Sequence, residues 1–266
     1  MGYPSSVWLS AAVAVLASHA TPAAAAEECT QTSEPIETDR PDTTNSSVVV
    51  PVGSLQNENG INVSRRNGAD VFDGTNSRWR LGIMPCFEVL IDLPNYVGTF
   101  RGDGASGFGN VAPAFKWQIS PIPGKVDLSM TVGAGLPTGA LAIAGPGVQP
   151  YLQFPWSVEL GNGWAFTGMV TNFFIPDDPV NKYSNESTFV IEKSFGEHSF
   201  LFVEYVGEFP LHGGTGALIN SGGGYRITHN QQIDFHVAVG LNRNSPNYIF
   251  GLGYSFRLDG LFKSRP

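Results

Sequence analysis

Charged residues are scarce in this chain of 266 residues, of which Asp, Glu, Lys and Arg together make up 14%. Ordinary soluble proteins carry roughly 25%. The shortage is greatest for basic residues, since 15 lysines and arginines stand against 23 aspartates and glutamates and leave a formal net charge of -8 at pH 7. So few basic residues, scattered along the chain, form no patch that could hold a nucleic acid. We therefore expect no nucleic-acid partner.

Long hydrophobic runs are missing beyond residue 26, where no stretch comes close to the roughly 20 apolar residues of a membrane-spanning helix. What the chain has instead is glycine, with 32 residues, and aromatic side chains, at 12%. Little charge, much glycine and no spanning helix together favour an extended, β-rich structure.

The first 26 residues look like a secretory signal peptide. An apolar run from Val7 to Ala17 is followed by Pro22 and by small residues up to Ala26, after which Glu27 begins a polar stretch. This order matches the apolar region and the small-residue cleavage site of exported proteins. The residues before the apolar run include no Lys or Arg, which departs from the usual pattern, and a buried N-terminal helix is the alternative interpretation. We expect residues 1–26 to be removed after export.

Residues 247–258, NYIFGLGYSFRL, alternate between two kinds of side chain. Large apolar side chains occupy one parity, at Tyr248, Phe250, Leu252, Tyr254, Phe256 and Leu258. Small or polar residues fill most of the other, at Gly251, Gly253, Ser255 and Arg257. A period of two predicts a β-strand, because successive side chains of an extended chain point to opposite faces. Since much of the second face is glycine, we expect something to lie close against it.

The same alternation recurs from residue 54 onward and predicts about twelve strands. Their expected ranges are 54–66, 76–84, 87–94, 107–119, 125–136, 149–160, 163–174, 187–195, 198–209, 215–227, 230–241 and 247–258. Short links alternate with longer ones, among them residues 67–75 (NGADVFDGT) and 95–106 (NYVGTFRGDGAS). Outer-membrane barrels have this arrangement, with short turns in the periplasm and long loops outside.

A closed barrel explains the alternation, since in lipid every backbone polar group must be paired internally and a barrel has no free edge. The predicted fold is all-β, a transmembrane antiparallel up-and-down β-barrel over residues 54–258. The bulky parity then faces lipid, and the following residues are candidates for aromatic girdles: Trp79, Trp117, Trp156, Trp164 and Tyr248. A secreted soluble β-protein is the alternative.

The regions outside the predicted barrel are short. Residues 27–53 are rich in Thr, Ser and Pro, so we expect an irregular periplasmic segment without a core of its own. Residues 259–266 are expected to form a C-terminal tail. The predicted location of the exported protein is the outer membrane of a Gram-negative cell, surrounded by outer-membrane lipid.

Ionisable side chains on the predicted inner face are the candidate lumen-lining residues. They are Arg78, Arg80, Glu88, Asp92, Lys116, Asp127, Glu159, Glu192, Glu204, Glu208, Arg226, Asp234, His236 and Arg257. One interpretation is a charged pore that selects solutes, and the other is a paired network that fills and stiffens a small barrel. The acidic excess predicts a preference for cations or neutral solutes over anions.

Five segments resemble the family labelled putative MetA-pathway of phenol degradation. They are IETDRPD (residues 36–42), PVGSLQNENG (51–60), RLGIMPCFEVLIDLPNY (80–96), GFGNVAPAFKWQI (107–119) and SPNYIFGLGYSFRL (245–258). The run ETDRPD followed by a glutamine-containing first strand is the most specific mark. The resemblance implies a Gram-negative outer-membrane β-barrel described as a transporter, which would need the barrel assembly machinery during biogenesis. The family name refers to aromatic degradation in some members and is no evidence for phenol binding here.

The two cysteines, Cys29 and Cys86, are not part of the family's pattern. Export would permit a disulfide between them. Cys29 lies in the expected periplasmic segment and Cys86 in an expected periplasmic turn, so a bond would hold that segment across the barrel mouth. Two unpaired thiols are the alternative.

No arrangement of residues points to an enzyme. His236 and Ser255 share the inner parity of neighbouring strands, but a catalytic pair requires a nucleophile-to-base geometry that the sequence does not provide. The other histidines stand singly, without metal-ligand spacing, so neither a metal nor another cofactor is expected. The favoured function is passive passage of small solutes, with aromatic or hydrophobic ones among the candidates. The alternative is a non-conducting barrel with a structural or partner-binding role.

Overall fold

The computed structural model describes residues 29–119, 126–175, 177–178, 180 and 182–262. The predicted signal peptide, residues 1–26, lies outside these residues, as do the last four residues of the expected tail. Within the described residues, no helix has both the length and the apolar character needed to cross a bilayer.

The described residues form one 14-stranded sheet and one short helix. The strands are β1 (Leu55–Arg66), β2 (Ala69–Met84), β3 (Phe87–Asp92), β4 (Tyr96–Arg101), β5 (Gly107–Phe108), β6 (Ala112–Gln118), β7 (Val126–Gly135), β8 (Gln149–Gly161), β9 (Trp164–Phe174), β10 (Tyr183–Phe195), β11 (Ser199–Pro210), β12 (Gly216–Thr228), β13 (Gln231–Gly240) and β14 (Tyr248–Leu258). The helix α2 (Leu141–Ala144) lies between β7 and β8.

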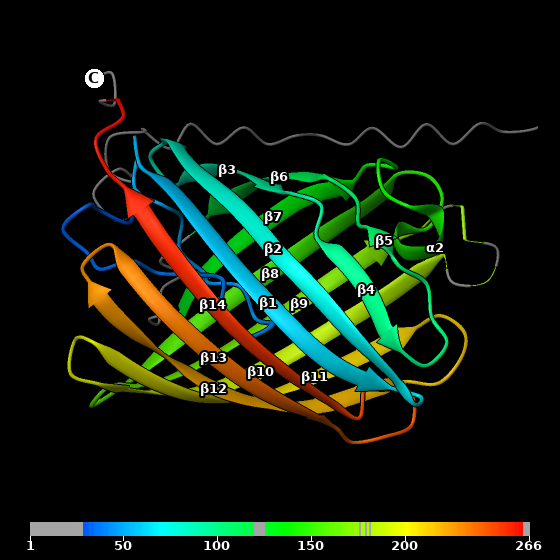
Figure 1. Cartoon of the computed structure of the whole chain (residues 1–266). Helices are drawn as coiled ribbons and strands as arrows, with labels where there is room; N and C mark the ends of the chain where they lie inside the picture. The colour runs from blue at the N-terminus through cyan, green and yellow to red at the C-terminus, as the bar shows by residue number, and fades with distance from the viewer. Residues whose placement is uncertain (1–28, 120–125, 176, 179, 181, 263–266) are drawn as a thin grey trace, which may run out of the picture.

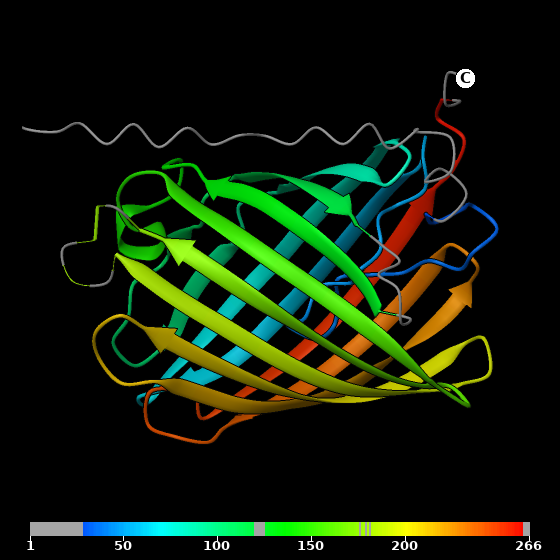
Figure 2. The same cartoon turned by 180° about the vertical axis from the view of Figure 1, so that it is seen from behind.

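The sheet closes on itself because β1 pairs antiparallel with β2 on one side and with β14 on the other. In the closing pair Leu55 lies opposite Leu258, and Arg65 lies opposite Tyr248. Both β3 and β4 pair with β2, so together they occupy one place in the wall. The next place is occupied by β6, which pairs with β3, and β5, which pairs with β4. The described strands therefore make a closed 12-strand antiparallel barrel with two extra strands, which confirms the predicted fold (Figures 1 and 2).

The two ends of the barrel differ in their connections. At one end β1 begins and β14 ends, and tight turns at Asn162, Gly196 and His229 join other strands. We call this the terminal end. The opposite end, which we call the loop end, carries longer connections, including residues 136–148 with α2 and residues 241–247.

The long link predicted at residues 67–75 is wrong, because β2 begins at Ala69 and meets β1 through a turn at Asn67 and Gly68. Both turn residues are left-handed, with φ of 50° and 84°. Asn-Gly is the preferred pair for a two-residue hairpin turn of this kind, because both positions need positive φ. The Asn-Gly pair was present in the sequence as a turn signal. It predicts the turn better than the polar residues at 69–75 predict a long link.

The predicted link at residues 95–106 and the predicted strand at 107–119 are also corrected. Residues 96–101 form β4, and the predicted strand is divided into β5 and β6. Pro94 lies in the break between β3 and β4, where a residue without a backbone N–H cannot continue the ladder. The wall is thus interrupted at two neighbouring positions, between β3 and β4 and between β5 and β6, at the same level along the barrel axis.

The two parities of the strands face different environments. On β14, Phe250 and Leu252 are 52% and 61% exposed on the outer face, whereas Ser255 is fully buried on the inner face. The largest fully buried side chains of the described residues are mostly polar, including Gln56, Glu58, Arg80, Glu88, Lys116 and Glu204. An apolar outer surface around a polar interior is the pattern of a barrel solvated by lipid.

Candidate functional site

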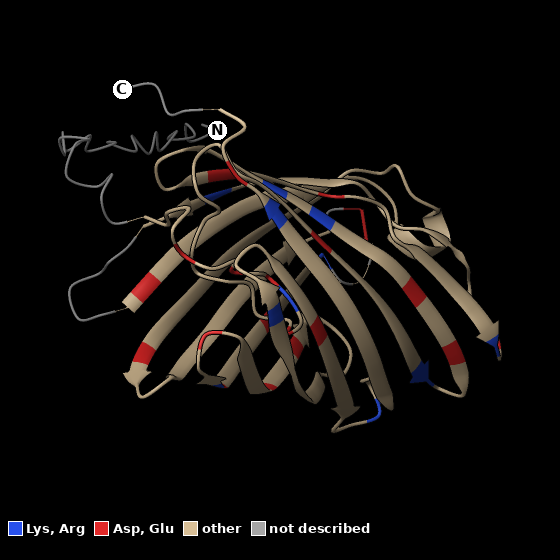
Figure 3. Ribbon diagram, turned by 60° about the vertical axis from the view of Figure 1, so that its left-hand side comes forward, with Lys and Arg blue, Asp and Glu red and all other residues tan. Residues whose placement is uncertain are grey.

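Residues 29–53, which we call the N-terminal segment, run through the lumen of the barrel and form no helix or strand (Figures 1 and 3). Ile36 is fully buried, and its amide donates to the carbonyl of His229 at 2.8 Å. Further along, the Val50 amide donates to a carboxylate oxygen of Glu88 at 2.6 Å. A segment without regular structure must satisfy its backbone groups elsewhere, and here the inner wall of the barrel supplies the partners.

Asp39 of the N-terminal segment lies at the centre of a group of cations. Its carboxylate is 2.9 Å from Arg78, 3.3 Å from Arg80 and 3.7 Å from Lys116. Burial alone would raise the pKa of Asp39, but the positive charges of Arg80, Lys116 and Arg78 hold that pKa well below its usual range. The carboxylate is therefore ionised and fixes the segment against β2 and β6.

Arg80 is the most heavily bonded of these cations. Its guanidinium donates to both oxygens of Glu88, at 3.0 and 3.2 Å, and to Glu58 at 3.1 Å. It also donates to the carbonyl of Val48 at 3.0 Å. Because its side chain is 1% exposed, each of these partners replaces water that the charge has lost. Arg80 thereby joins two wall residues, Glu58 and Glu88, to the N-terminal segment.

Glu204 on β11 holds the opposite side of the N-terminal segment. Its carboxylate accepts from the amide of Thr43 at 2.9 Å, and from the amide and the hydroxyl of Thr44 at 2.9 and 2.8 Å. Asn220 on β12 donates a further bond at 2.9 Å. A buried carboxylate satisfied mostly by backbone donors can be placed without a cation beside it.

Arg40 lies against the wall formed by β1 and β14. It donates to Asp234 at 3.3 Å and to the carbonyl of Leu252 at 3.4 Å. Gly60 and Gly253 are paired across these two strands, and a Cβ at either position would overlap the Arg40 side chain. The glycine face noted in the sequence is therefore the surface on which this arginine rests.

Two further arginines hold the N-terminal segment near the terminal end. Arg257 is 2.9 Å from Asp259 and donates to the carbonyl of Glu34, also at 2.9 Å. Arg226 is 3.3 Å from Glu37 and donates to the carbonyl of Ile36 at 3.3 Å. The segment is thus bonded to the wall from its entry into the lumen onward.

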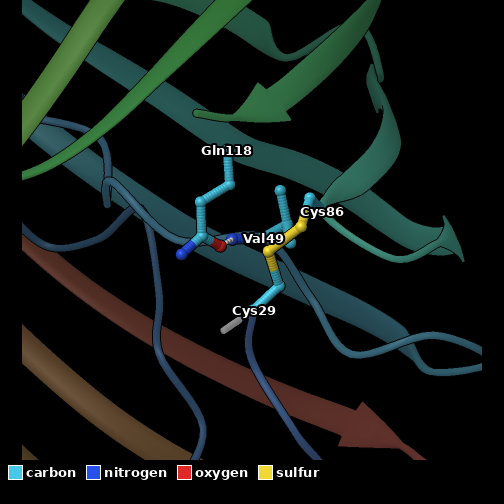
Figure 4. Close-up of a disulfide and its surroundings, with 4 residues drawn as sticks. All are labelled: Cys29, Val49, Cys86 and Gln118. Carbon is cyan, nitrogen blue, oxygen red and sulfur yellow. Dashed lines mark hydrogen bonds between the residues drawn. A yellow bond between two sulfur atoms is a disulfide. The ribbon is translucent and has the colours of Figure 1, made fainter. Parts of the chain in front are cut away.

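Cys29 and Cys86 form a disulfide in the structure, with their Cα atoms 5.3 Å apart (Figure 4). This separation lies within the usual range for such a bond. Beside it, the Val49 amide donates to the side-chain oxygen of Gln118 at 3.0 Å. The bond joins the start of the N-terminal segment to the turn between β2 and β3, so it ties the segment to the terminal end.

Two cavities lie beside the N-terminal segment, the first against β7 to β13 and the second against β1 to β3. The first, of about 390 Å³, lies toward the terminal end, and its lining includes Glu37, Asp127, Glu159, Glu192 and Arg226. The second, of about 330 Å³, lies toward the loop end, and its lining includes Asn76, Arg78, Asp92, Asn95 and Asn110. Arg40, Asp42 and Asn45 line both cavities. These three residues of the segment form the boundary between them.

Most of the predicted lining residues contact the N-terminal segment. Those with such a bond are Arg78, Arg80, Glu88, Lys116, Glu204, Arg226, Asp234 and Arg257. Those that line a cavity include Asp127, Glu159 and Glu192 in the first, and Asp92, bonded to Arg78, in the second. Glu208 is exposed near the loop end of β11. Most of the predicted set therefore either bonds the N-terminal segment or lines a cavity, and Glu208 and His236 do neither.

His236 lies half-buried between two asparagines and not beside Ser255. Its ring nitrogens are 3.1 Å from the side-chain oxygens of Asn220 and Asn62. In the sheet His236 lies opposite Gly251, whereas Ser255 lies opposite Gln232. Within the described residues, no group of three or more His, Cys, Asp or Glu side chains is placed to hold a metal ion.

The sequence analysis did not identify the lumen residues Glu58, Asn76 and Asn220 of the wall, nor those of the N-terminal segment. Those of the segment are Asp39, Arg40, Asp42, Thr43, Thr44 and Asn45. One signal was available: the inner parity carries glycines where a neighbour must come close, and acidic residues that need donors. The segment itself has no periodicity from which its position could be predicted.

A closed barrel with an apolar outer face, a polar lumen and short turns at one end defines an outer-membrane type of β-barrel. The chain belongs to the family described as "Putative MetA-pathway of phenol degradation", which it matches over residues 38–258. The resemblance found in the sequence is confirmed. No curated protein matches the sequence.

Solved structures with a similar fold include an outer membrane channel from Pseudomonas putida F1, with a TM-score of 0.66 and 15% sequence identity. The alignment covers 84% of this chain and 100% of that chain. The NanC porin has a TM-score of 0.57 at 8% identity, covering 77% of this chain and 100% of the porin. The KdgM porin in complex with disordered oligogalacturonate has a TM-score of 0.51 at 8% identity, with 76% and 98% covered. These relatives are described as channels and porins, which are not enzymes.

Proposed function

We propose that this chain is an outer-membrane channel through which small hydrophilic solutes pass by diffusion. The observation that carries the proposal is a pair of polar cavities in the lumen, of about 390 and 330 Å³, that share a boundary. Their common boundary is three side chains of the N-terminal segment, not a layer of the barrel wall. A small rearrangement of these side chains would join the cavities into one aqueous route.

The fold supports this proposal. The first structural relative above is described as an outer membrane channel and the second as a porin, and their likeness to this chain extends over most of it. The fold supplies the rigid wall, and the N-terminal segment narrows the space inside it. A narrowed lumen suits small solutes better than large ones.

The lining favours polar solutes over apolar ones. Asp127, Glu159 and Glu192 line the first cavity, and Asn76, Asn95 and Asn110 line the second. Aromatic or hydrophobic solutes stay a prediction from the sequence, and these side chains do not favour them. Since the first cavity is mainly acidic, cations and neutral molecules are the preferred class.

A non-conducting barrel is the second candidate, and the bonds of the N-terminal segment favour it. Eight of the predicted lining residues bind that segment, and a disulfide ties its start to the wall. Such a barrel would serve as a rigid element of the envelope or as a platform for a partner at its loops.

The proposed setting follows from the same features. After export by its signal peptide, the chain would be inserted into the outer membrane of a Gram-negative cell by the barrel assembly machinery. The outer parity would then contact outer-membrane lipid, as the exposed apolar residues of β14 suggest.

Conductance in planar bilayers separates the two candidates. The chain without residues 1–26 is refolded in detergent, its folding is checked by heat-modifiable mobility on gels, and single insertions are recorded in KCl. Discrete current steps are the expected result. Silence from protein shown to be folded and inserted would reject the channel and leave the non-conducting barrel.

A further inference from the structure

The boundary between the two cavities carries three side chains of different charge. Arg40 is basic, Asp42 is acidic and Asn45 is neutral, and all three line both cavities. A solute that moves from one cavity to the other must pass them. The net charge of this boundary therefore bears on which ions can cross.

The charge of Arg40 is offset where it lies. Asp234, whose side chain is fully buried, is 3.3 Å from the Arg40 guanidinium. The carbonyl of Leu252 accepts a second bond from the same nitrogen, at 3.4 Å. Opposite charges this close largely cancel at the distance of a passing ion, so Arg40 contributes little net charge to the route.

Asp39, the other acid of the same turn, is also offset. It lies within 4 Å of Arg78, Arg80 and Lys116. Its negative charge is thus balanced within the network that holds the N-terminal segment to the wall. Of the acidic residues at positions 39 and 42, Asp42 is the one left to consider.

Asp42 lies in a different environment. The charged groups that act most strongly on it are Glu204 on β11, Glu192 on β10 and Glu37 on its own segment, all of them acidic. Asn45, the third boundary residue, adds no charge. Burial and these acids raise the pKa of Asp42 well above its ordinary value, so Asp42 supplies a net negative charge to the boundary at a pH above that raised pKa.

The first cavity leads to this boundary with the same sign of charge. Its acidic lining includes Glu34, Glu37, Asp127, Glu159 and Glu192. The basic residues of the lining are Arg226 and Arg40, and each of these is paired with an acid, Glu37 and Asp234. An acidic approach concentrates cations at the passage.

We propose that Asp42 is the residue that determines charge selectivity in this lumen, admitting small cations and excluding anions. The inference rests on the proposed channel function. A carboxylate that lines both cavities lies beside the route of every ion that crosses from one to the other, whereas a carboxylate that lines one cavity meets only some of them. The class of solute that follows is a small inorganic or organic cation.

Reversal potentials under a tenfold KCl gradient, recorded at an alkaline pH that ionises Asp42, test this assignment. The wild-type chain is expected to favour K⁺ over Cl⁻. In Asp42→Asn the permeability ratio should fall about thirty-fold, because removing one unit charge within about 4 Å of the ion in a water-like medium changes the K⁺ and Cl⁻ permeabilities about five-fold each, in opposite directions. Asp42→Glu should keep the wild-type ratio because it keeps the charge.

Two control variants separate the boundary from other acidic positions. Asp103→Asn removes an exposed loop charge and should leave the ratio unchanged. Asp127→Asn removes a charge from the wall of the first cavity and should lower the ratio less than Asp42→Asn does. Should Asp42→Asn fail to insert, Asp42→Ser removes the same charge with a smaller side chain and is measured in its place.

The outcomes are distinct. A fall of about thirty-fold confined to the neutral variants of Asp42 supports the assignment. Current steps with the same ratio in wild type and Asp42→Asn overturn it and leave the channel standing. Absence of current steps from every folded variant overturns both the proposed function and this assignment.

Discussion

Arg40 and Asp234 form an ion pair in the lumen, 3.3 Å apart, although 194 residues separate them in the sequence. The pair rests on Gly60 and Gly253, which lie opposite each other on β1 and β14. These two strands close the barrel, so the same contact joins the start and the end of the wall to the N-terminal segment.

Gly253→Ala tests the role of the glycine surface. The new methyl group would overlap Asp234 and Arg40 and separate their charges, at a cost of about 1–3 kcal/mol in the free energy of unfolding. Arg40→Met should cost a similar amount, and the double variant no more than either one, because both remove the same interaction. Urea unfolding in lipid vesicles measures these free energies.

Gly135→Ala is the control for that experiment. A Cβ at Gly135 meets its nearest neighbours at 3.6 Å or more, which is ordinary contact, so its free energy of unfolding should match wild type. If Gly253→Ala and Arg40→Met were additive, the glycine and the arginine would act independently and the proposed surface would be wrong.

Glu204→Gln should loosen the N-terminal segment. The carboxylate accepts from the amides of Thr43 and Thr44 and from Asn220, and an amide group would place its own donor against one of these. We expect a loss of about 1–3 kcal/mol and faster hydrogen exchange at residues 43 and 44. Glu208→Gln, an exposed change on the same strand, should alter neither, and equal exchange in both variants would contradict the role of Glu204.

Arg80→Lys should destabilise the barrel more than the same change at Arg65. Arg80 binds both oxygens of Glu88 and is 1% exposed, whereas the Arg65 side chain is 37% exposed and pairs with Asp70. A lysine cannot reproduce the two-pronged geometry, and the expected loss is about 1.5–3 kcal/mol against about 0–1 kcal/mol for the exposed pair. Urea unfolding again provides the comparison, and equal losses would sink this interpretation.

The disulfide between Cys29 and Cys86 should be present in protein purified without reductant. Mass spectrometry of an unreduced digest is expected to find one peptide that contains both cysteines. Because the bond closes a loop with a sequence separation of 57, its removal in Cys29→Ser/Cys86→Ser should cost about 2–4 kcal/mol. Detection of two free thiols would show that the N-terminal segment is held by non-covalent bonds alone.

Cation selectivity should rise with pH through the titration of Asp42. Burial, followed by the nearby carboxylates of Glu204 and Glu192, raises the pKa of Asp42 well above its ordinary value. Below that raised pKa the residue is neutral, and as pH increases through it the boundary gains a negative charge. The K⁺ to Cl⁻ permeability ratio of wild type should therefore increase with pH, and Asp42→Asn should show a flatter profile.

The raised pKa of Asp42 also affects stability, and its stabilising contribution falls as pH rises, whereas cation selectivity increases with pH. A carboxyl group whose pKa is higher in the folded state stabilises that state below its unfolded pKa of about 3.9, and this contribution is lost as pH rises through the folded pKa. Hydrogen exchange at residues 43 and 44, corrected for its intrinsic pH dependence, should show a more tightly held segment in mildly acid solution. If Asp42→Asn kept the full pH dependence, another group would be responsible.

Strand positions were largely predictable because alternation is a local property. The ranges expected for β8, β9 and β11 to β14 agree with the structure to within one or two residues. Errors arose where local chemistry interrupts the alternation, at the Asn67–Gly68 turn and at Pro94. The first could have been read from the Asn-Gly pair itself.

Partners within the lumen were not predictable in the same way. Parity alone placed Arg80, Glu88 and Lys116 on one face, but the sequence does not state that Asp39 lies between them. The N-terminal segment has no period, and its bonds reach wall residues 19 to 225 positions away. Contacts at such separations are set by the tertiary fold and not by local sequence patterns.

The sequence by itself determined that this chain is a barrel in lipid, because a period of two with an apolar outer parity records which side of each strand is solvated by hydrocarbon. Only the tertiary structure decided what fills the lumen. The sequence does not show whether Glu204 meets a cation or two backbone amides, or whether Arg40 or Asp42 keeps a net charge. These properties depend on three-dimensional distances, because electrostatic energy falls with separation in space, whatever the order of residues along the chain.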